Sequence, residues 1–436
     1  MNSANMALTL PINDFLTTVA DRGRSLMGLP VSSKNGDTTG TVGLCLRLLQ
    51  TKGMASGLAL SQQILASYET FNQDQKIEFF QALLEQLACD TGNVSQAAAV
   101  FLENNSQSNL KKLSKAASPQ YAPLISLLNQ SPASTMKLLN MRSDLLGMLR
   151  ENPDLKALDV EFVNVFSSWF NRGFLGLHNI DWHTSPTILE NIIKYEAVHG
   201  ISDWDDLGRR IKPADRMIYG FFHPNLENEP LIFVEVALMA TMPDAIAPVL
   251  TKDRTPLDPH KATTAVFYSI SNCQNGLRGI PLGNFLIKQV VEDVKFHFPN
   301  LKDFVTLSPI LKYGDWIRDQ ENNHILPNTL DEIDTVDKTN QASLLAAAAH
   351  FLSNEKANDS KPIDPVCRFH IGNGARLERL NWAARMDDIG FNSSYAIMAN
   401  YRYIIDDIEK NHEAFESDGT VTLAPSVKKQ ADLFSS

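Results

Sequence analysis

A glycine-containing turn in the second half of the chain has the residue types of an anion-binding site. It follows an apolar run over residues 265–270 and precedes an amphipathic run over residues 285–298, so we expect the order strand, turn, helix. Backbone amides at a helix N-terminus lack partners within the helix and can hold a pyrophosphate. Arg278 adds a fixed positive charge suited to phosphate. An ordinary strand-to-helix turn is the alternative interpretation. The glycines expected to leave room for a ligand are Gly276, Gly279 and Gly283.

Ser308 and His370 are the side chains whose positions best suit acid–base chemistry. Ser308 ends an apolar run over residues 304–307 and precedes Pro309, which favours extended backbone. We therefore expect it at the carboxyl end of a strand, where open sheets bind ligands. His370 lies between two apolar residues, and strand alternation would direct its imidazole away from both. A histidine in a cleft can move protons near neutral pH. A turn serine and a hydrogen-bonded core histidine are the structural alternatives.

Two further polar clusters could contribute to a site. Glu196 and His199 are three residues apart in a segment with a helical pattern, and a Glu-x-x-His pair on one helix face can bind metal. The other ligands that a metal site needs have no evident position, so we expect no metal. Residues 399–403 alternate amide, guanidinium and phenol side chains. This second pattern favours either a pocket wall or a solvated strand edge.

Charge and composition argue against several classes of partner. The chain has 436 residues and a formal net charge of -11, with no concentrated basic face, so we expect no nucleic-acid partner. No apolar run approaches the roughly 20 residues of a spanning helix, and no secretory signal is recognisable, so we expect no membrane partner. The four cysteines share no CxxC spacing, which favours free thiols in a reducing compartment. We expect a cytoplasmic protein.

The chain changes character near Gly173. Residues from about 40 to 170 repeat apolar positions at intervals of three and four, which predicts successive helices, with Asp74 and Asn93 as N-caps. After Gly173, β-branched runs such as residues 231–239 alternate with helical segments. These patterns favour an α/β or α+β domain over residues 173–436 after an all-α helical bundle over residues 1–172, and the fold class expected for the chain is α+β.

Many ordered local motifs make the chain resemble malonyl-CoA decarboxylases. The motifs extend from Trp169 to Tyr403, and agreement of this kind is far more specific than one short motif. They include Trp169-Phe170, Trp182-His183, Glu196-Ala-Val-His199, Phe267-Tyr-Ser-Ile-Ser271, Gly276-Leu-Arg-Gly279, Leu307-Ser-Pro-Ile310, Phe369-His370, Asn373-Gly-Ala375 and Met398-Ala-Asn-Tyr-Arg-Tyr403.

The resemblance implies a fold and a set of site residues. The catalytic domain would be similar to the GNAT acyltransferases, with Ser308 and His370 as catalytic residues, and Asn400 and Tyr403 are expected to complete the pocket. Pro281 occupies a position that is usually glycine in the wider acyltransferase pattern, so one amide donor to the pyrophosphate is missing. The implied CoA-binding turn consists of Arg278, Gly279, Ile280, Pro281, Leu282, Gly283 and Asn284.

The implied reaction converts malonyl-CoA to acetyl-CoA and CO2 through a thioester enolate. Hydrogen-bond donors at the enolate oxygen and an acid for the α-carbon are the requirements, and the thioester itself accepts the electrons, so we expect no cofactor. We expect a homo-oligomer assembled through the helical domain. A GNAT-type N-acyltransferase, which would need an amine acceptor, is one alternative function. A non-catalytic acyl-CoA sensor or scaffold is another.

Overall fold

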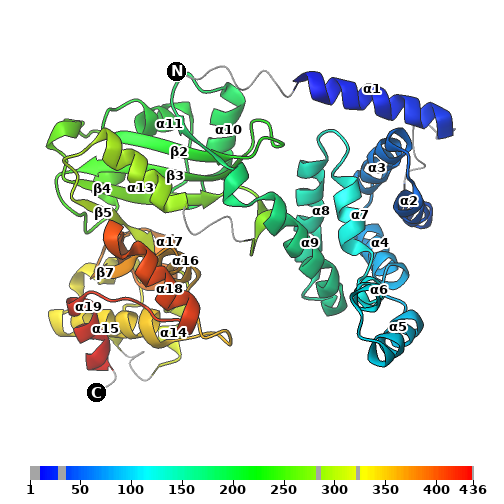
Figure 1. Cartoon of the computed structure of the whole chain (residues 1–436). Coiled ribbons are helices and arrows are strands. Elements are labelled where there is room, and N and C mark those ends of the chain that lie inside the picture. The colour runs from blue at the N-terminus through cyan, green and yellow to red at the C-terminus, as the bar shows by residue number, and fades with distance from the viewer. Residues whose placement is uncertain (1–9, 28–35, 281–285, 321–324, 435–436) are drawn as a thin grey trace. The chain divides into compact units, whose positions relative to one another are not determined.

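The structure is a computed structural model that describes residues 10–27, 36–280, 286–320 and 325–434 (Figure 1). The chain forms two compact units. The first comprises Met1–Leu175, His223–Glu227 and Gln274–Leu282, and the second comprises Gly176–Phe222, Asn228–Cys273 and Gly283–Ser436. The short segment 274–282 contains most of the predicted CoA-binding turn. By its contacts it belongs with the N-terminal helices.

The first unit is built from helices. An aromatic cluster joins α3 to α4, where the rings of Tyr68 and Phe79 lie 5.5 Å apart. The predicted N-caps are wrong: Asn72 caps α4 in a capping box with Gln75, and Asp90 caps α5. Both helices begin earlier than expected because another Asx residue precedes each predicted cap. The helices are α1 (Leu10–Met27), α2 (Thr38–Gln50), α3 (Met54–Glu69), α4 (Gln73–Gln86), α5 (Thr91–Glu103), α6 (Gln107–Ala117), α7 (Tyr121–Leu128), α8 (Ser134–Met148) and α9 (Lys156–Trp169).

The second unit contains an eight-stranded mixed sheet in the order β1-β2-β3-β4-β5-β8-β6, with β7 paired to β8. Neighbouring strands are antiparallel except β4 and β5, which are parallel. This parallel pair confirms the strand, turn, helix, strand order expected around the glycine turn. The strands are β1 (Gly176–Ile180), β2 (Arg216–Phe222), β3 (Pro230–Met239), β4 (Thr264–Asn272), β5 (Asp303–Thr306), β6 (Ser308–Pro309), β7 (Arg376–Asn381) and β8 (Met398–Arg402).

Helices pack against this sheet and form a hydrophobic core with it. Apolar residues of α10 and α11, including Ile192 and Leu207, pack with Ile218 of β2 and Phe233 of β3. The expected fold class, an all-α region followed by a mixed sheet with helices, is confirmed. The helices are α10 (Pro186–Tyr195), α11 (Trp204–Ile211), α12 (Ala247–Leu250), α13 (Leu286–His297), α14 (Tyr313–Arg318), α15 (Lys338–Asn354), α16 (Pro365–Gly372), α17 (Asp388–Ser394), α18 (Ile408–Asp418) and α19 (Pro425–Phe434).

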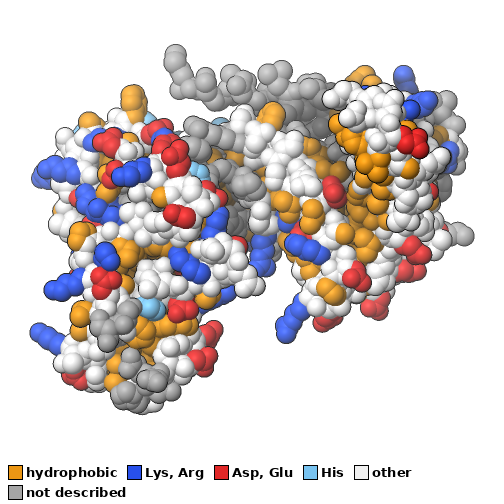
Figure 2. All heavy atoms as spheres, turned by 60° about the horizontal axis from the view of Figure 1, so that its bottom comes forward, with side chains coloured by type: hydrophobic (Ala, Val, Ile, Leu, Met, Phe, Trp, Pro, Cys, Tyr) orange, Lys and Arg blue, Asp and Glu red, His pale blue; other side chains and the backbone are white. Residues whose placement is uncertain are grey.

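Positive and negative side chains are interspersed on the face of the molecule that Figure 2 shows, with no extended patch of one sign. None of the helices in the described ranges combines the length and apolarity needed to cross a bilayer. In the same part of the chain, no three His, Cys, Asp or Glu residues are grouped so that they could hold a metal ion.

Candidate active site

Ser308 lies where a strand of the second unit is interrupted. Val305 of β5 and Ser308 of β6 pair with Arg402 and Ala399 of β8 in one continuous register. Between these pairs a side chain replaces the usual backbone acceptor, because Thr306 Oγ1 accepts the hydrogen bond of the Tyr401 backbone amide at 3.1 Å. The interruption leaves the Ser308 hydroxyl, on a residue 6% exposed, beside that of Thr306.

His370 lies on a helix, and the predicted strand at this position is wrong. Helix α16 begins at Pro365 and is capped by Asp364, whose carboxylate accepts hydrogen bonds from the amides of Val366 and Cys367. The same carboxylate accepts the Leu311 amide at 2.7 Å. Asp364 therefore connects the start of the histidine's helix to the segment that follows Ser308.

Ser308, His370 and Tyr403 form one line of buried hydrogen bonds. The Oγ atom of Ser308 lies 2.9 Å from Nε2 of His370, and Nδ1 of the same ring lies 2.9 Å from the Tyr403 hydroxyl. At the other end, Ser308 donates to Thr306 Oγ1 at 2.9 Å. The structure thus brings together three of the four residues expected in the pocket.

The donor and acceptor of the two bonds to His370 depend on its tautomer. Ser308 has one hydroxyl proton, and when that proton is used in the bond to Thr306, the proton between Ser308 and the ring lies on Nε2. Nδ1 of the neutral ring then accepts a hydrogen bond from Tyr403. Burial lowers the pKa of His370 to about 3, which keeps the ring neutral at physiological pH in the absence of substrate. Burial also raises the pKa of Tyr403, so its hydroxyl keeps its proton.

Tyr401 fixes the plane of the imidazole. Its ring stacks on that of His370 with centroids 4.6 Å apart and planes inclined by 26°. Both residues are buried. Together with the bonds at its two nitrogens, this stacking leaves the ring of His370 little freedom to rotate.

Asn400 is buried but bonds to other groups. Strand alternation places its side chain on the face of β8 opposite to Tyr401. Its Nδ2 donates to the Thr306 carbonyl at 2.7 Å and to the Pro243 carbonyl at 3.3 Å, and its Oδ1 accepts from Arg379 at 3.2 Å. Asn400 therefore holds the backbone behind Thr306 and makes no hydrogen bond to Ser308 or His370.

The described part of the predicted CoA-binding turn belongs to the first unit. Arg278 and Gly279 are exposed and Ile280 is buried. Gly279 has a φ of +76°, a conformation that favours glycine. Pro281, Leu282, Gly283 and Asn284 lie outside the described residues.

Gly276 has a different role from the one expected. A Cβ atom at this position would lie 2.1 Å from the Leu139 carbonyl oxygen of α8. The backbone of α8 fills the space that this glycine leaves. The glycine is therefore required for packing on α8, and not to make room for a ligand.

Glu196 and His199 do not form the expected helical pair. Helix α10 ends at Tyr195, and the Glu196 carboxylate accepts the His199 amide at 2.7 Å and the hydroxyls of Ser269 and Ser271 at 2.8 and 3.1 Å. Its oxygens thus secure the chain against β4. Nε2 of His199 is buried without a hydrogen-bond partner, and burial lowers the pKa of this ring to about 4.

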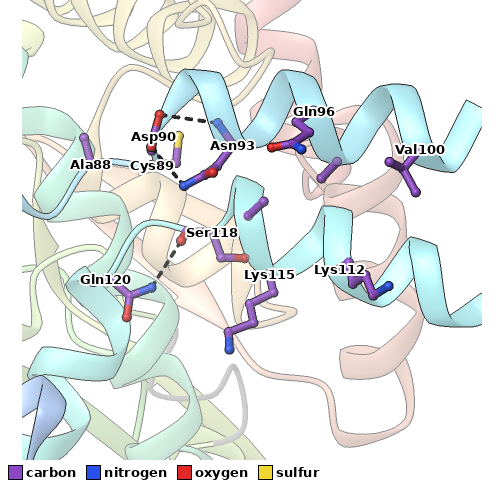
Figure 3. A pocket seen from close by; sticks show the side chains of 12 residues that line it. Ala88, Cys89, Asp90, Asn93, Gln96, Val100, Lys112, Lys115, Ser118 and Gln120 are labelled. Atoms are coloured by element: carbon purple, nitrogen blue, oxygen red, sulfur yellow. Dashed lines mark hydrogen bonds between the residues drawn. The ribbon is translucent and has the colours of Figure 1, made fainter.

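A hollow between α5 and α6 lies in the first unit, and Figure 3 shows its lining. Asp90 at its edge is used as an N-cap and accepts the Asn93 side-chain amide at 2.9 Å. Lys112 and Lys115 come from α6. These residues form no nucleophile and base pair, so the hydrogen-bonded line around His370 is the stronger candidate for chemistry.

Thr306, Tyr401 and Asp364 shape this site but are not among the residues predicted for it. Thr306 and Ser308 are two residues apart, which on an extended chain places them on one face. Tyr401 has the same relation to Tyr403. Asp364 followed by proline is the pattern of a helix start and would have predicted α16.

Comparisons with known proteins point to one family. Residues 173–435 match the family described as malonyl-CoA decarboxylase C-terminal domain, and residues 87–170 match its N-terminal domain. The crystal structure of malonyl-CoA decarboxylase from Rhodopseudomonas palustris is 45% identical, with a TM-score of 0.83 over 91% of this chain and 100% of that chain. That from Agrobacterium vitis is 44% identical, with a TM-score of 0.82 over 90% and 99%.

A curated relative extends the agreement. Malonyl-CoA decarboxylase, mitochondrial, from Anser anser anser is 30% identical over 389 residues, which cover 78% of this chain and 77% of that protein. The family match over residues 173–435 alone includes more than half of the chain. The chain therefore belongs to the malonyl-CoA decarboxylase family of carbon–carbon lyases.

Proposed function

We propose that this chain converts malonyl-CoA to acetyl-CoA and CO2, with Ser308, His370 and Tyr403 as its catalytic residues. The observation that carries the proposal is the buried line of hydrogen bonds through these three side chains. It offers a neutral imidazole with a proton on Nε2, next to a hydroxyl that can orient a carboxylate. Family membership supplies the substrate class.

The reaction needs a stabilised enolate. The bond between the α-carbon and the carboxylate breaks, its electron pair moves to the α-carbon and the thioester oxygen, and CO2 leaves. Donors at the thioester oxygen lower this barrier most, by roughly 3–4 kcal/mol for each donor. We assign this role to the Nε2–H group of His370, because an imidazole N–H can act as such a donor. No cofactor is required, since the thioester accepts the electrons.

The proton that completes the reaction is taken up from solvent by His370 when the substrate binds. The malonyl carboxylate brings a negative charge to a ring whose pKa is about 3 in the empty site, and an adjacent anion raises the pKa of a histidine. His370 then takes up one proton and delivers it to the α-carbon, which balances the one proton consumed per turnover. Tyr403 suits both states, because its hydroxyl donates to a neutral ring and accepts from an imidazolium.

Ser308 and Asn400 complete the site in different ways. Ser308 orients the malonyl carboxylate through its hydroxyl, which Thr306 holds in the absence of substrate. Asn400 supports the pocket from behind by its bond to the Thr306 carbonyl. On this account Asn400 maintains the shape of the site and takes no part in the proton transfer.

The substrate's CoA part is bound by residues 278–284. Arg278 pairs with phosphate, and the exposed Gly279 lets the backbone approach the ligand. Residues 1–172 serve assembly of a homo-oligomer, and residues 173–436 form a GNAT-like catalytic domain. We place the protein in the cytoplasm, without a nucleic-acid or membrane partner.

Turnover without an acceptor tests the reaction. The purified protein is incubated with malonyl-CoA alone, and the products are separated by chromatography. Acetyl-CoA released in step with CO2 is the expected result. Acyl transfer only when an amine is added would favour an N-acyltransferase. Binding of malonyl-CoA without any product would favour a sensor.

A further inference from the structure

A buried ion pair in the helical unit contacts the segment that carries Arg278. Arg142 of α8 and Asp159 of α9 are each 1% exposed, and Nε of Arg142 lies 2.9 Å from Oδ1 of Asp159. The same guanidinium donates from Nη1 to the backbone carbonyl of Gly276 at 2.5 Å. Lys156 contacts the second oxygen of Asp159 at 2.5 Å. One arginine therefore connects two helices to one turn.

The turn is held closely at this contact. Gly276 lies in a short 3-10 helix, η5 (Asn275–Leu277), and a Cβ atom there would lie 2.1 Å from the Leu139 carbonyl of α8. The next amides continue the turn, because Arg278 N–H bonds to the Asn275 carbonyl and Ile280 N–H bonds to the Leu277 carbonyl. The base of the turn is thus buried on α8, whereas Arg278 itself is exposed.

The chemistry of the ion pair suits positioning better than stability. Burying two charges costs desolvation energy, and well-packed apolar residues often replace such pairs without loss of stability. What an arginine adds is a planar set of donors in fixed directions. Here the guanidinium donates to the carboxylate of Asp159 and to the backbone carbonyl of Gly276. It therefore fixes the turn relative to α8 and α9.

We propose that Arg142 and Asp159 are positioning residues for the segment 276–280, which carries Arg278, so that the helical unit takes part in substrate binding. The proposal rests on the proposed role of Arg278 as a phosphate partner. The ion pair acts through the turn on binding of the nucleotide end of the substrate. Binding of the acyl end does not depend on the ion pair.

The test measures binding of CoA and turnover of two substrates. The first variant is Arg142→Lys, which keeps the charge and loses the fork of donors. The second is the double variant Arg142→Met with Asp159→Leu, which removes both charges so that neither is left buried alone. Lys76→Met is the matched control, because Lys76 pairs at 2.7 Å with Asp144 on the same helix α8. Calorimetry gives the Kd for CoA, and thermal melting confirms that each variant is folded.

Both Arg142 variants should raise the Kd for CoA and the KM for malonyl-CoA by about tenfold or more, within the range seen when a binding group is displaced. Their kcat and their kcat/KM for malonyl-pantetheine, which lacks the nucleotide, should stay within about twofold of wild type, and Arg278→Ala should behave alike. Lys76→Met should leave all these values unchanged.

An unchanged Kd for CoA in either folded Arg142 variant would overturn the proposal, and so would equal losses on both substrates. The binding measurement needs no turnover, so the pair can be tested even if wild-type protein does not decarboxylate malonyl-CoA. Failure of the proposed reaction and failure of this positioning role therefore give different results.

Discussion

Ser308 and His370 are separated by 62 positions in the chain, yet Oγ of the serine lies 2.9 Å from Nε2 of the histidine. The serine follows an interrupted strand, and the histidine is carried by helix α16. Asp364 joins the two segments through its bonds to the amides of Leu311 and Cys367. The short distance is therefore built into the fold by a residue that touches neither side chain.

Removing the imidazole should abolish most of the activity. His370→Asn should lower kcat by roughly 100-fold or more, because the proton donor and the enolate partner are lost together. KM should change less, since CoA contacts lie elsewhere. Steady-state kinetics measure both values. His199→Asn is the matched control: it removes another buried imidazole, and its kcat should stay close to wild type. Near-normal kcat in His370→Asn would exclude this ring from the mechanism.

Thr306 should act through Ser308. Thr306→Val removes the acceptor of the Ser308 hydroxyl and should lower kcat about tenfold, whereas Ser308→Ala should lower it further. In the Ser308→Ala background, Thr306→Val should cause no additional loss, because residues that share one function are not additive. Thr306→Ser should restore activity. Equal losses from Thr306→Val in both backgrounds would show a purely structural role.

Acid should destabilise the protein through its buried histidines. The folded-state pKa values of His370 and His199 are lowered from 6.5 to about 3 and about 4. Between those values and 6.5 the unfolded chain binds more protons, so the stability that the two neutral rings contribute is fully present above pH 6.5 and is lost as the pH falls toward each folded-state pKa. Each ring contributes a slope of up to about 1.4 kcal/mol per pH unit.

Urea unfolding from pH 4 to pH 7 measures this slope. His199→Asn should unfold with a shallower pH dependence than wild type, and exposed His297→Asn should not. Burial raises the pKa of Glu235 to about 8, so this group gives the unfolding free energy the opposite slope between pH 4.5 and 8. Because Glu235 is present in every variant, the comparison of variants isolates the contribution of His199. Parallel pH profiles for wild type and His199→Asn would contradict the assignment of a buried neutral ring.

Asp364 should contribute both to the stability of the fold and to catalysis. Asp364→Ala removes the N-cap of α16 and the acceptor for Leu311, and should lower the free energy of unfolding by about 1–3 kcal/mol. It should also lower kcat, because His370 and Ser308 lose their common anchor. Asp364→Asn keeps one acceptor oxygen and should therefore retain part of the stability and part of the activity. The idea fails if Asp364→Ala melts early but keeps wild-type kcat at a temperature where it is folded.

The elements around the turn could be predicted from sequence because each has a strong local pattern. Residues 264–272 and 286–297 form the expected strand and helix. The two apolar neighbours of His370 suggest a strand, whereas the Asp364-Pro365 pair indicates the helix start that the structure has. Strand alternation puts Asn400 on the face of β8 opposite to Tyr401.

Contacts between residues far apart in the chain have no local sequence pattern that predicts them. Arg142 and Gly276 are 134 positions apart, and nothing near either residue indicates that a helix of the first unit packs on the turn. The tautomer of His370 also follows only from the contact between Thr306 and Ser308. Such contacts depend on how the elements pack, which periodicity does not specify. The division into residues 1–172 and 173–436 and the assembly role of the helices stay predictions.

The most direct measurement follows the carbon and the proton of one turnover. Malonyl-CoA with ¹³C in its free carboxylate is incubated with the purified protein in D2O, and the products are analysed by mass spectrometry. We expect wild type to form labelled CO2 and acetyl-CoA with one deuterium in the methyl group, and His370→Asn to form them at least about 100-fold more slowly. Unchanged malonyl-CoA with wild-type protein, or equal rates for the two proteins, would contradict it.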